Sequence, residues 1–133
     1  MGSVVVDASV VLGVLDPGDA HHVSATRALK RARAAGDNIT LPASALAEVL
    51  VGASRLGASA VRTTEAFVDT IVDEVHPIDR SVARSAAAYR SSHRSLRLPD
   101  AFVLAVGATT NADTVLTADR GWAKVDRRVH VIR

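Results

Sequence analysis

Short Val-rich segments alternate with longer Ala-rich segments along almost the whole chain. Val favours strands and Ala favours helices, so the pattern predicts strands separated by helices. Such alternation is typical of a parallel β-sheet with helices on both faces, an α/β architecture. We expect strands at 3–6, 38–41, 74–78, 114–117 and 128–132, and helices at 8–15, 19–35, 42–56, 58–73, 79–92 and 99–110.

The size and composition predict one domain spanning residues 1–133. Cysteine is absent, which excludes disulfides, thiolate metal sites and cysteine catalysis and is compatible with a reducing cytoplasm. We see no signal peptide and no apolar stretch long enough to span a membrane. The expectation is therefore a cytoplasmic protein that has no membrane partner.

The formal net charge is only +2, but the basic residues are clustered. Two groups lie on or beside expected helices, and they are either solvated helix faces or a surface that binds phosphates. Aromatic residues are scarce, so a binder that relies on base stacking is not favoured. The groups are Arg27, Lys30, Arg31 and Arg33, and Arg80, Arg84, Arg90, His93, Arg94 and Arg97.

Four acidic residues are the strongest functional signal. Asp7 and Asp119 follow expected strands, Asp100 lies at the start of an expected helix, and Glu48 lies within a helix among apolar neighbours. Taken singly, each aspartate has a simple alternative as a helix cap or loop acid. Together, four converging carboxylates need a positive partner, and Mg²⁺ or Mn²⁺ is the simplest one because both prefer oxygen ligands.

Nearby polar residues receive supporting or structural predictions. Ser9 and Thr117 are either surface hydroxyls, the commoner role for such residues, or donors of hydrogen bonds to the metal-binding carboxylates or to a metal-bound water. Asp19 and Asp79 are interpreted as helix caps, and Asp113 as a loop acid. Two further residues remain outside the predicted site: His21 and His22 are adjacent on the chain and would point about 100° apart on a helix, which makes them poor joint ligands.

Several segments together resemble the PIN-domain pattern in residue type, order and spacing. They are the strand ending Val5-Val6-Asp7-Ala8-Ser9, the mid-chain Glu48, Leu98-Pro99-Asp100-Ala101 and Leu116-Thr117-Ala118-Asp119. The length and outline are similar to those of the VapC toxins of bacterial VapBC toxin–antitoxin systems. No single segment is specific, but the ordered set covers essentially the entire chain.

The resemblance implies a PIN-like fold with a five-stranded, mostly parallel sheet. It also implies an Mg²⁺- or Mn²⁺-dependent endoribonuclease that hydrolyses RNA phosphodiester bonds with metal-activated water. Asp7, Glu48, Asp100 and Asp119 would be the catalytic, metal-binding residues, with Asp7 and Asp100 as direct ligands. Expected partners are the RNA substrate, a VapB-type antitoxin that inhibits the enzyme, and a second copy of the chain in a homodimer.

Other classes of protein fit less well. A haloacid dehalogenase-type phosphatase needs a second aspartate where Ser9 stands, and a receiver domain needs an acidic pair near the first strand. A dinucleotide-binding fold needs glycines in its first turn, and residues 7–10 contain none. The remaining alternative is a catalytically silent PIN-like module that binds RNA or protein. Trp122 is expected to pack the loop after the fourth strand, with base stacking as the alternative.

Overall fold

A five-stranded parallel sheet forms the centre of the molecule, in the order β3-β2-β1-β4-β5. The computed structural model describes residues 2–133. All four strand pairings are parallel, so the expected mostly parallel sheet is confirmed in stricter form. The strands are β1 (Ser3–Val6), β2 (Asn38–Pro42), β3 (Glu74–His76), β4 (Thr114–Thr117) and β5 (Val129–Val131).

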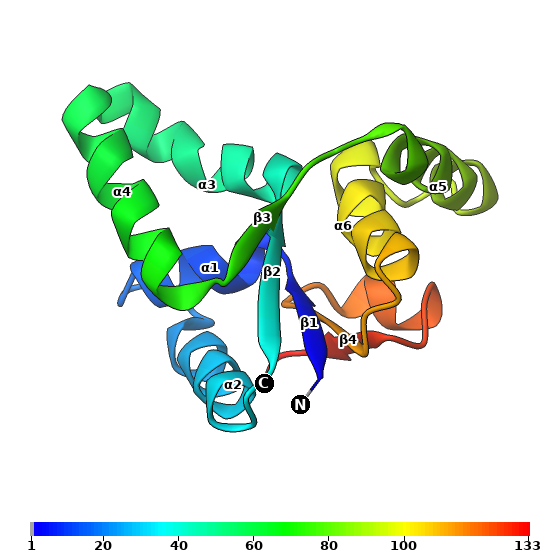
Figure 1. Cartoon of the computed structure of the whole chain (residues 1–133), viewed down its shortest axis with the longest axis horizontal. Helices are drawn as coiled ribbons and strands as arrows, with labels where there is room; N and C mark the ends of the chain where they lie inside the picture. Colours follow the sequence, from blue (N-terminus) through cyan, green and yellow to red (C-terminus); the bar gives the residue numbers. More distant parts are fainter. Residues whose placement is uncertain (1) are drawn as a thin grey trace.

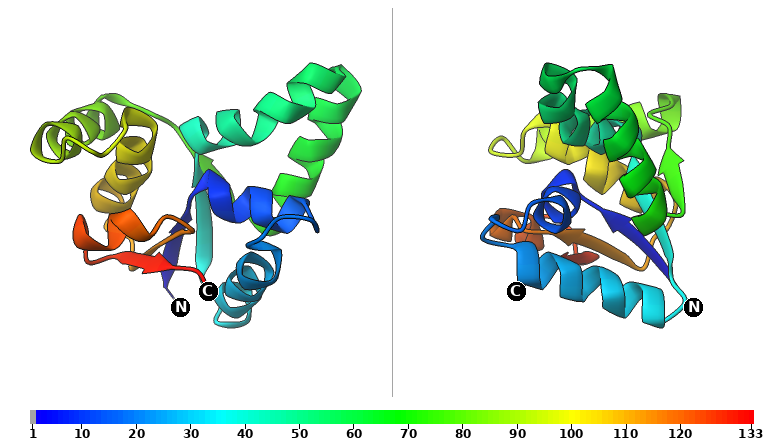
Figure 2. Two further views of the ribbon diagram at one scale, coloured as in Figure 1. Left: turned by 180° about the vertical axis from the view of Figure 1, so that it is seen from behind. Right: turned by 90° about the vertical axis from the view of Figure 1, so that its left-hand side faces the viewer.

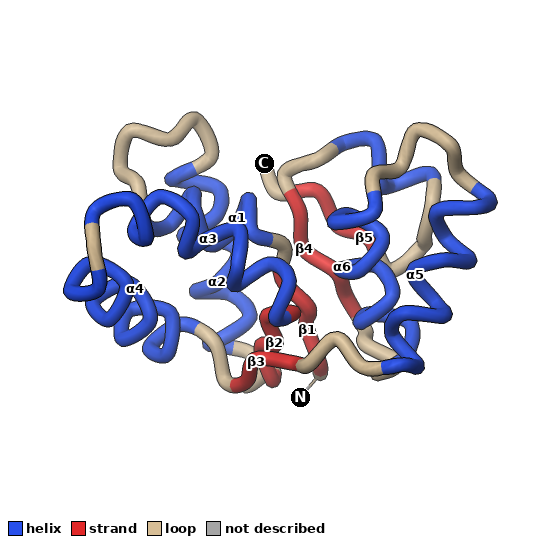
Figure 3. Tube along the Cα trace, turned by 90° about the horizontal axis from the view of Figure 1, so that it is seen from above, coloured by secondary structure: helices blue, strands red, loops and turns tan. Residues whose placement is uncertain are grey.

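Helices cover the sheet on both sides, as Figures 1 and 3 show. Helices α1, α2 and α4 lie on one side and α5 and α6 on the other, while α3 begins where β2 ends. The predicted boundaries agree with the structure to within about three residues at each end. The helices are α1 (Ala8–Leu15), α2 (His22–Ala34), α3 (Ala43–Leu56), α4 (Ala58–Ile71), α5 (Arg80–Ser92), α6 (Leu98–Thr109) and the 3-10 helix η1 (Arg120–Lys124).

Two local predictions have different outcomes. Asp79 caps α5, because its carboxylate accepts a hydrogen bond from Val82 N at 2.9 Å. Asp19 does not cap α2: that helix begins at His22, and the Asp19 carboxylate accepts from His21 N in the preceding turn. The cap prediction for Asp19 was wrong because the chain makes an extra turn before the helix begins.

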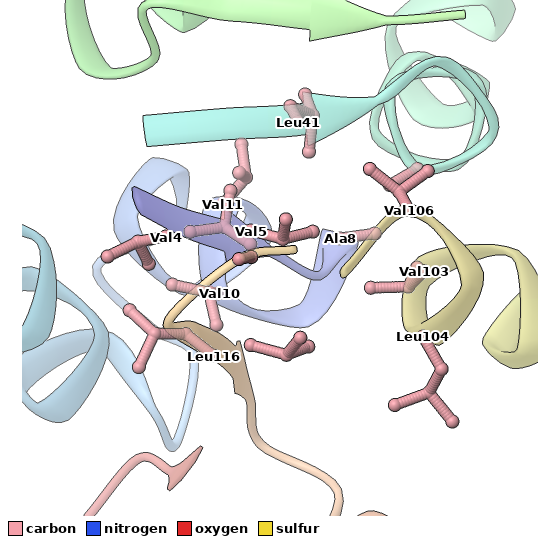
Figure 4. Close-up of a cluster of buried hydrophobic side chains, with 14 of the residues drawn as sticks. Val4, Val5, Ala8, Val10, Val11, Leu41, Val103, Leu104, Val106 and Leu116 are labelled. Carbon is pink, nitrogen blue, oxygen red and sulfur yellow. The ribbon is translucent and has the colours of Figure 1, made fainter. Parts of the chain in front are cut away.

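Aliphatic side chains fill the space between the sheet and its helices (Figure 4). Residues Val4, Val5 and Val6 of β1 are all buried, as expected for the central strand of a parallel sheet. Helix α6 lies very close to β4 at Gly107, where an added Cβ would meet Val115 Cγ2 at only 2.6 Å. The absence of a side chain at Gly107 therefore allows α6 to approach the sheet this closely.

The chain changes direction across the sheet at β1. It passes from β1 outward to β2 and β3, and it then returns to place β4 on the opposite side of β1. In open parallel sheets, such a switch leaves a crevice at the carboxyl ends of the strands, where ligands bind. Asp7 directly follows β1, and Asp119 lies two residues beyond β4. The fold therefore brings two of the four predicted acidic residues to the switch point.

Candidate acidic metal site

Asp7 is the buried centre of the site, with only 8% of its surface exposed. Its Oδ2 accepts hydrogen bonds from Ser9 Oγ at 2.7 Å and from Thr117 Oγ1 at 3.1 Å. The Asp7 side chain makes no hydrogen bond that caps α1, so the simple helix-cap interpretation fails for this residue. The expected roles of Ser9 and Thr117 as donors to an acidic residue are confirmed.

The two hydroxyl groups also connect Asp7 to the backbone after β4. Ser9 Oγ accepts from Ala118 N at 3.1 Å, and Thr117 Oγ1 accepts from Asp119 N at the same distance. Each hydroxyl therefore has a defined donor and acceptor, which fixes the orientation of its proton toward Asp7. This network holds the Asp7 carboxylate in one position relative to the Asp119 loop.

Burial raises the pKa of the Asp7 carboxyl above its ordinary value of 3.8. The hydrogen bonds from Ser9 and Thr117 oppose this shift, and the negative charge of Asp100 adds to it. A buried carboxylate that is short of positive partners costs free energy when it is ionised. Binding of a cation beside Asp7 would therefore offset this cost and stabilise the folded protein.

Glu48, which lies on α3, is close to the carboxylates of Asp7 and Asp100. The residue is exposed, yet partial desolvation raises the pKa of its carboxyl, and the charges of Asp7 and Asp100 raise it further. The Glu48 carboxylate makes no hydrogen bond within the described chain. The carboxylates of Asp7, Glu48 and Asp100 are thus close enough to influence one another, while their role as a shared metal site stays a prediction.

Arg97 is the cation among these acidic groups. Its guanidinium pairs with Asp100, with both the Nε–Oδ2 and Nη2–Oδ1 distances at 3.4 Å. The hydrogen bond to Asp100 and the charge of Asp100 raise the Arg97 pKa most, and the charges of Glu48 and Asp119 contribute as well. Because Asp119 acts on the same arginine, all four predicted acidic residues belong to one electrostatic neighbourhood.

Asp119 has a second, structural role. It precedes η1, and its Oδ1 accepts a hydrogen bond from Gly121 N at 2.8 Å. Trp122 in η1 is only 2% exposed and packs the loop after β4, as predicted. Two other acids lie outside the neighbourhood: Asp79 caps α5, and Asp113 accepts a hydrogen bond from Ser3 N at the opposite end of β1.

The chemistry of the donors fits a hard divalent cation, because the four side chains offer only carboxylate oxygens. Within residues 2–133, no three acidic or histidine side chains are yet arranged closely enough to hold a metal. Asp100 is turned toward Arg97, while one Asp7 oxygen is held by two hydroxyl groups. Binding of one cation by several of these carboxylates would therefore need side-chain movement, above all at Asp100.

Arg97 is the component that the sequence prediction missed. Its position three residues before Asp100 is the spacing at which oppositely charged helix side chains meet, so a local signal was present. In the sequence, Arg97 is one of several basic residues between 80 and 97, and this cluster conceals its pairing with Asp100. In the structure it belongs to the acidic site.

Comparison with known proteins identifies the fold. The sequence profile of the PIN domain matches residues 4–128. No curated protein sequence is significantly similar to the chain. Solved structures with similar folds include a toxin–antitoxin complex from Klebsiella pneumoniae, with a TM-score of 0.75 and 22% identity over 96% of both chains.

Two further structures show the same architecture. VapC20 of Mycobacterium tuberculosis, described as a sarcin–ricin loop cleaving toxin, has a TM-score of 0.70 and 21% identity over 91% of this chain and 93% of its own. VapBC2 from Rickettsia felis, bound to a DNA fragment from its promoter, has a TM-score of 0.75 and 12% identity over 98% and 99%. The chain belongs to the PIN-domain family, and its fold is the one seen in the toxins of VapBC systems.

Proposed function

We propose that this chain is a divalent-metal-dependent endoribonuclease of the VapC type, which acts as the toxin of a toxin–antitoxin pair. The observation that supports this most is that Asp100 and Glu48 lie close enough to the buried Asp7 carboxylate for their charges to interact with it, while Asp119 interacts with Arg97 beside them. PIN domains are generally nucleases that depend on divalent metals.

In this proposal, Asp7 and Asp100 bind Mg²⁺ or Mn²⁺ directly, and Glu48 and Asp119 complete the site. A divalent cation held there would lower the pKa of water and neutralise charge on the phosphoryl group in the transition state. Ser9 and Thr117 keep Asp7 oriented toward the site. Hydrolysis by in-line attack of water would leave a 5′-phosphate and a 3′-hydroxyl on the RNA fragments.

The proposed partners follow from the same family relationship. Similar folds occur in structures described as toxin–antitoxin and VapBC complexes, some of them bound to DNA. We propose that a VapB-type antitoxin inhibits the enzyme and that the toxin forms a homodimer. Leu56, Val51 and Phe67 on the α3–α4 hairpin are exposed and offer apolar surface for such contacts.

The test is cleavage of total RNA by the purified protein in Mg²⁺, in Mn²⁺ and in EDTA. We expect discrete fragments in one or both metals, no fragments in EDTA, and loss of cleavage in Asp7→Asn and Asp100→Asn. Asp79→Asn is the matched control, because it makes the same chemical change outside the site and asparagine caps helices as well as aspartate does.

The competing function is a silent PIN-like module that binds RNA or protein without cutting it. Metal binding separates the two, because a degenerate site should not take up Mn²⁺ in a titration. Full activity of Asp7→Asn in Mg²⁺ or Mn²⁺ would contradict the proposed role of the acidic site.

A further inference from the structure

A second feature, outside the acidic site, is a surface groove between α2 and β5. Two adjoining hollows of about 470 and 430 Å³ form it, and both are lined by Ala28, Arg31, Val129 and His130. We refer to these two hollows together as the α2–β5 groove. Its walls come from parts of the chain about 100 residues apart, so only the folded protein contains it.

The half of the groove toward the carboxyl end of β5 is cationic. Arg27 and Arg31 from α2 and His130 and Arg133 from β5 and its end line this hollow, and no acidic side chain does. Arg27 Nη1 also donates a hydrogen bond to the backbone oxygen of Arg133 at 3.5 Å. Within residues 2–133, neither Arg27 nor Arg31 forms an ion pair with an acidic side chain.

The structure also shows which basic residues of α2 have other partners. Arg33 pairs with Asp73 at 3.1 Å and donates to the carbonyl of Ile71 at 3.1 Å, so it holds α2 against the end of α4. In the other half of the groove, Asp37 and Asp113 accept hydrogen bonds from backbone N–H groups at the start of β1. Arg127 and Arg128 line that half as well, so its charge is mixed, whereas the half toward the carboxyl end of β5 has basic side chains and no acidic one.

That cationic end lies at the same edge of the sheet as the acidic site. Val131 of β5 is in register with Thr117 of β4, and Ile132 N donates to Thr117 O at 2.9 Å. Ala123 of η1, four residues after Asp119, lines the same hollow. Both views in Figure 2 show the carboxyl end of the chain beside α2. The groove thus opens beside the loop that carries Asp119.

We propose that the α2–β5 groove binds the phosphate backbone of the RNA on one side of the cleaved bond. This inference rests on the proposed ribonuclease function and adds a substrate-binding surface to it. Arg27 and Arg31 are four residues apart on α2, about 6 Å along the helix axis. Two arginines at this spacing suit neighbouring phosphates of an extended strand, because each guanidinium can form paired hydrogen bonds with phosphate oxygens.

The residues that line the groove also indicate how it would bind RNA. No Phe, Tyr or Trp side chain lines either hollow, so the groove lacks a large aromatic platform for stacking successive bases. Contacts to phosphates carry no direct sequence information. The α2–β5 groove would therefore add affinity and fix the direction of the strand, while the choice of cleavage site would depend on residues elsewhere.

The test is binding of a fluorescein-labelled oligouridine in EDTA, measured by fluorescence anisotropy over a range of KCl concentrations. EDTA separates backbone binding from cleavage. The test variant is Arg27→Gln with Arg31→Gln. The control is Arg55→Gln with Arg62→Gln, which removes the same charge from two exposed arginines of the α3–α4 hairpin. Thermal melting shows whether each variant is folded.

We expect the groove variant to bind about tenfold more weakly, and the slope of log affinity against log salt to fall by about 1.4 if two phosphate contacts are lost. Its cleavage of total RNA in Mn²⁺ should show a raised KM with a smaller change in kcat. A third variant, Arg27→Lys with Arg31→Lys, keeps both charges and should retain most of the binding.

Three outcomes separate this inference from the function on which it rests. Equal binding and equal KM in the groove and control variants, with cleavage intact, would overturn the groove proposal and leave the ribonuclease proposal standing. Unchanged RNA binding with lost binding of polyglutamate would identify an acidic protein segment as the occupant instead. Failure of the wild-type protein to bind or cleave RNA would overturn both proposals.

Discussion

The Arg97 guanidinium lies side-on against the Asp100 carboxylate, with two nitrogen–oxygen distances of 3.4 Å. The arginine side chain is 75% exposed, whereas that of the aspartate is 15% exposed. The Asp100 carboxylate is thus largely buried, and the arginine that pairs with it lies between it and the solvent. A divalent cation that takes Asp100 as a ligand would compete with this arginine for the same carboxylate oxygens.

We therefore expect Arg97→Ala to tighten Mn²⁺ binding. The variant removes both a competing partner of Asp100 and a positive charge near Glu48 and Asp119. Because exposed ion pairs are weak and screened by salt, the gain should be modest, about three- to tenfold at low ionic strength. Isothermal titration calorimetry measures it, with Arg94→Ala as the control. Weaker binding in Arg97→Ala would show instead that Arg97 supports the metal site.

Asp7→Asn should stabilise the metal-free protein near neutral pH. The folded state raises the pKa of Asp7, so it binds this proton more tightly than the unfolded state does. The contribution of Asp7 to stability therefore falls as pH rises from its ordinary pKa of 3.8 through its raised value. Removing the charge should increase the free energy of unfolding by about 1 kcal/mol at pH 7, a common size for such gains.

Urea denaturation in EDTA at several pH values measures this effect as the difference between wild type and Asp7→Asn. The difference should shrink toward pH 3, where the carboxyl group is protonated in both states. Asp79→Asn is the control and should give little difference at any pH. A wild-type protein that is more stable than Asp7→Asn at pH 7 would mean that another group already compensates the buried charge.

Thr117→Val should shift the pH dependence of RNA cleavage. Thr117 Oγ1 donates to Asp7 and lowers the pKa of that carboxyl, so its loss should raise the pKa further. Since Asp7 must be ionised to bind a metal, the acidic limb of the pH–rate profile should move to higher pH. Activity at neutral pH should fall about tenfold, as is typical when a group supporting a metal ligand is removed.

Thr117→Ser is the matched variant for this prediction, because it keeps the hydroxyl group and removes only a methyl group. It should restore the position of the acidic limb. If Thr117→Val and Thr117→Ser show the same profile as wild type, the hydrogen bond from Thr117 does not control the ionisation of Asp7.

Tyr89→Phe should destabilise the fold without changing the site. The Tyr89 hydroxyl donates to the buried carboxylate of Asp126, which links α5 to the segment after η1. Desolvation, with the hydrogen bond to Asp126, raises the pKa of Tyr89 to about 12, so the hydroxyl stays protonated at neutral pH. Its loss should cost about 1–3 kcal/mol in urea denaturation. Mn²⁺ affinity should be unchanged, and a large change would mean that this contact also positions the site.

Local sequence patterns predicted most of the fold. The Val-rich runs gave the strands, and Gly57, which has φ of 122° between α3 and α4, marked the helix break correctly. The strand order was not predictable in the same way, because it depends on contacts between distant segments. Only the structure shows that β4 returns to the side of β1 opposite β2 and so brings Asp7 beside the loop of Asp119.

The sequence indicated which acidic residues lie near this end of the sheet, but not their arrangement, and their metal-binding role stays a prediction. Asp7, Ser9 and Thr117 could be related because strand ends meet at one edge of a parallel sheet. Arg97 turned out to partner Asp100, which charge counting along the chain does not reveal. The α2–β5 groove was beyond sequence analysis, because Arg27 and His130 come together only through tertiary packing.

The close approach of α6 to β4 at Gly107 has a consequence for the acidic site. Gly107 lies seven residues after Asp100, about 10 Å along the same helix. Any larger side chain there would meet Val115 and push α6 outward. Because Asp100 is carried on the first turn of that helix, the gap between Asp100 and Asp7 depends on a position that touches neither of them. Selection on the spacing of these two carboxylates can therefore act through a buried glycine with no chemical role.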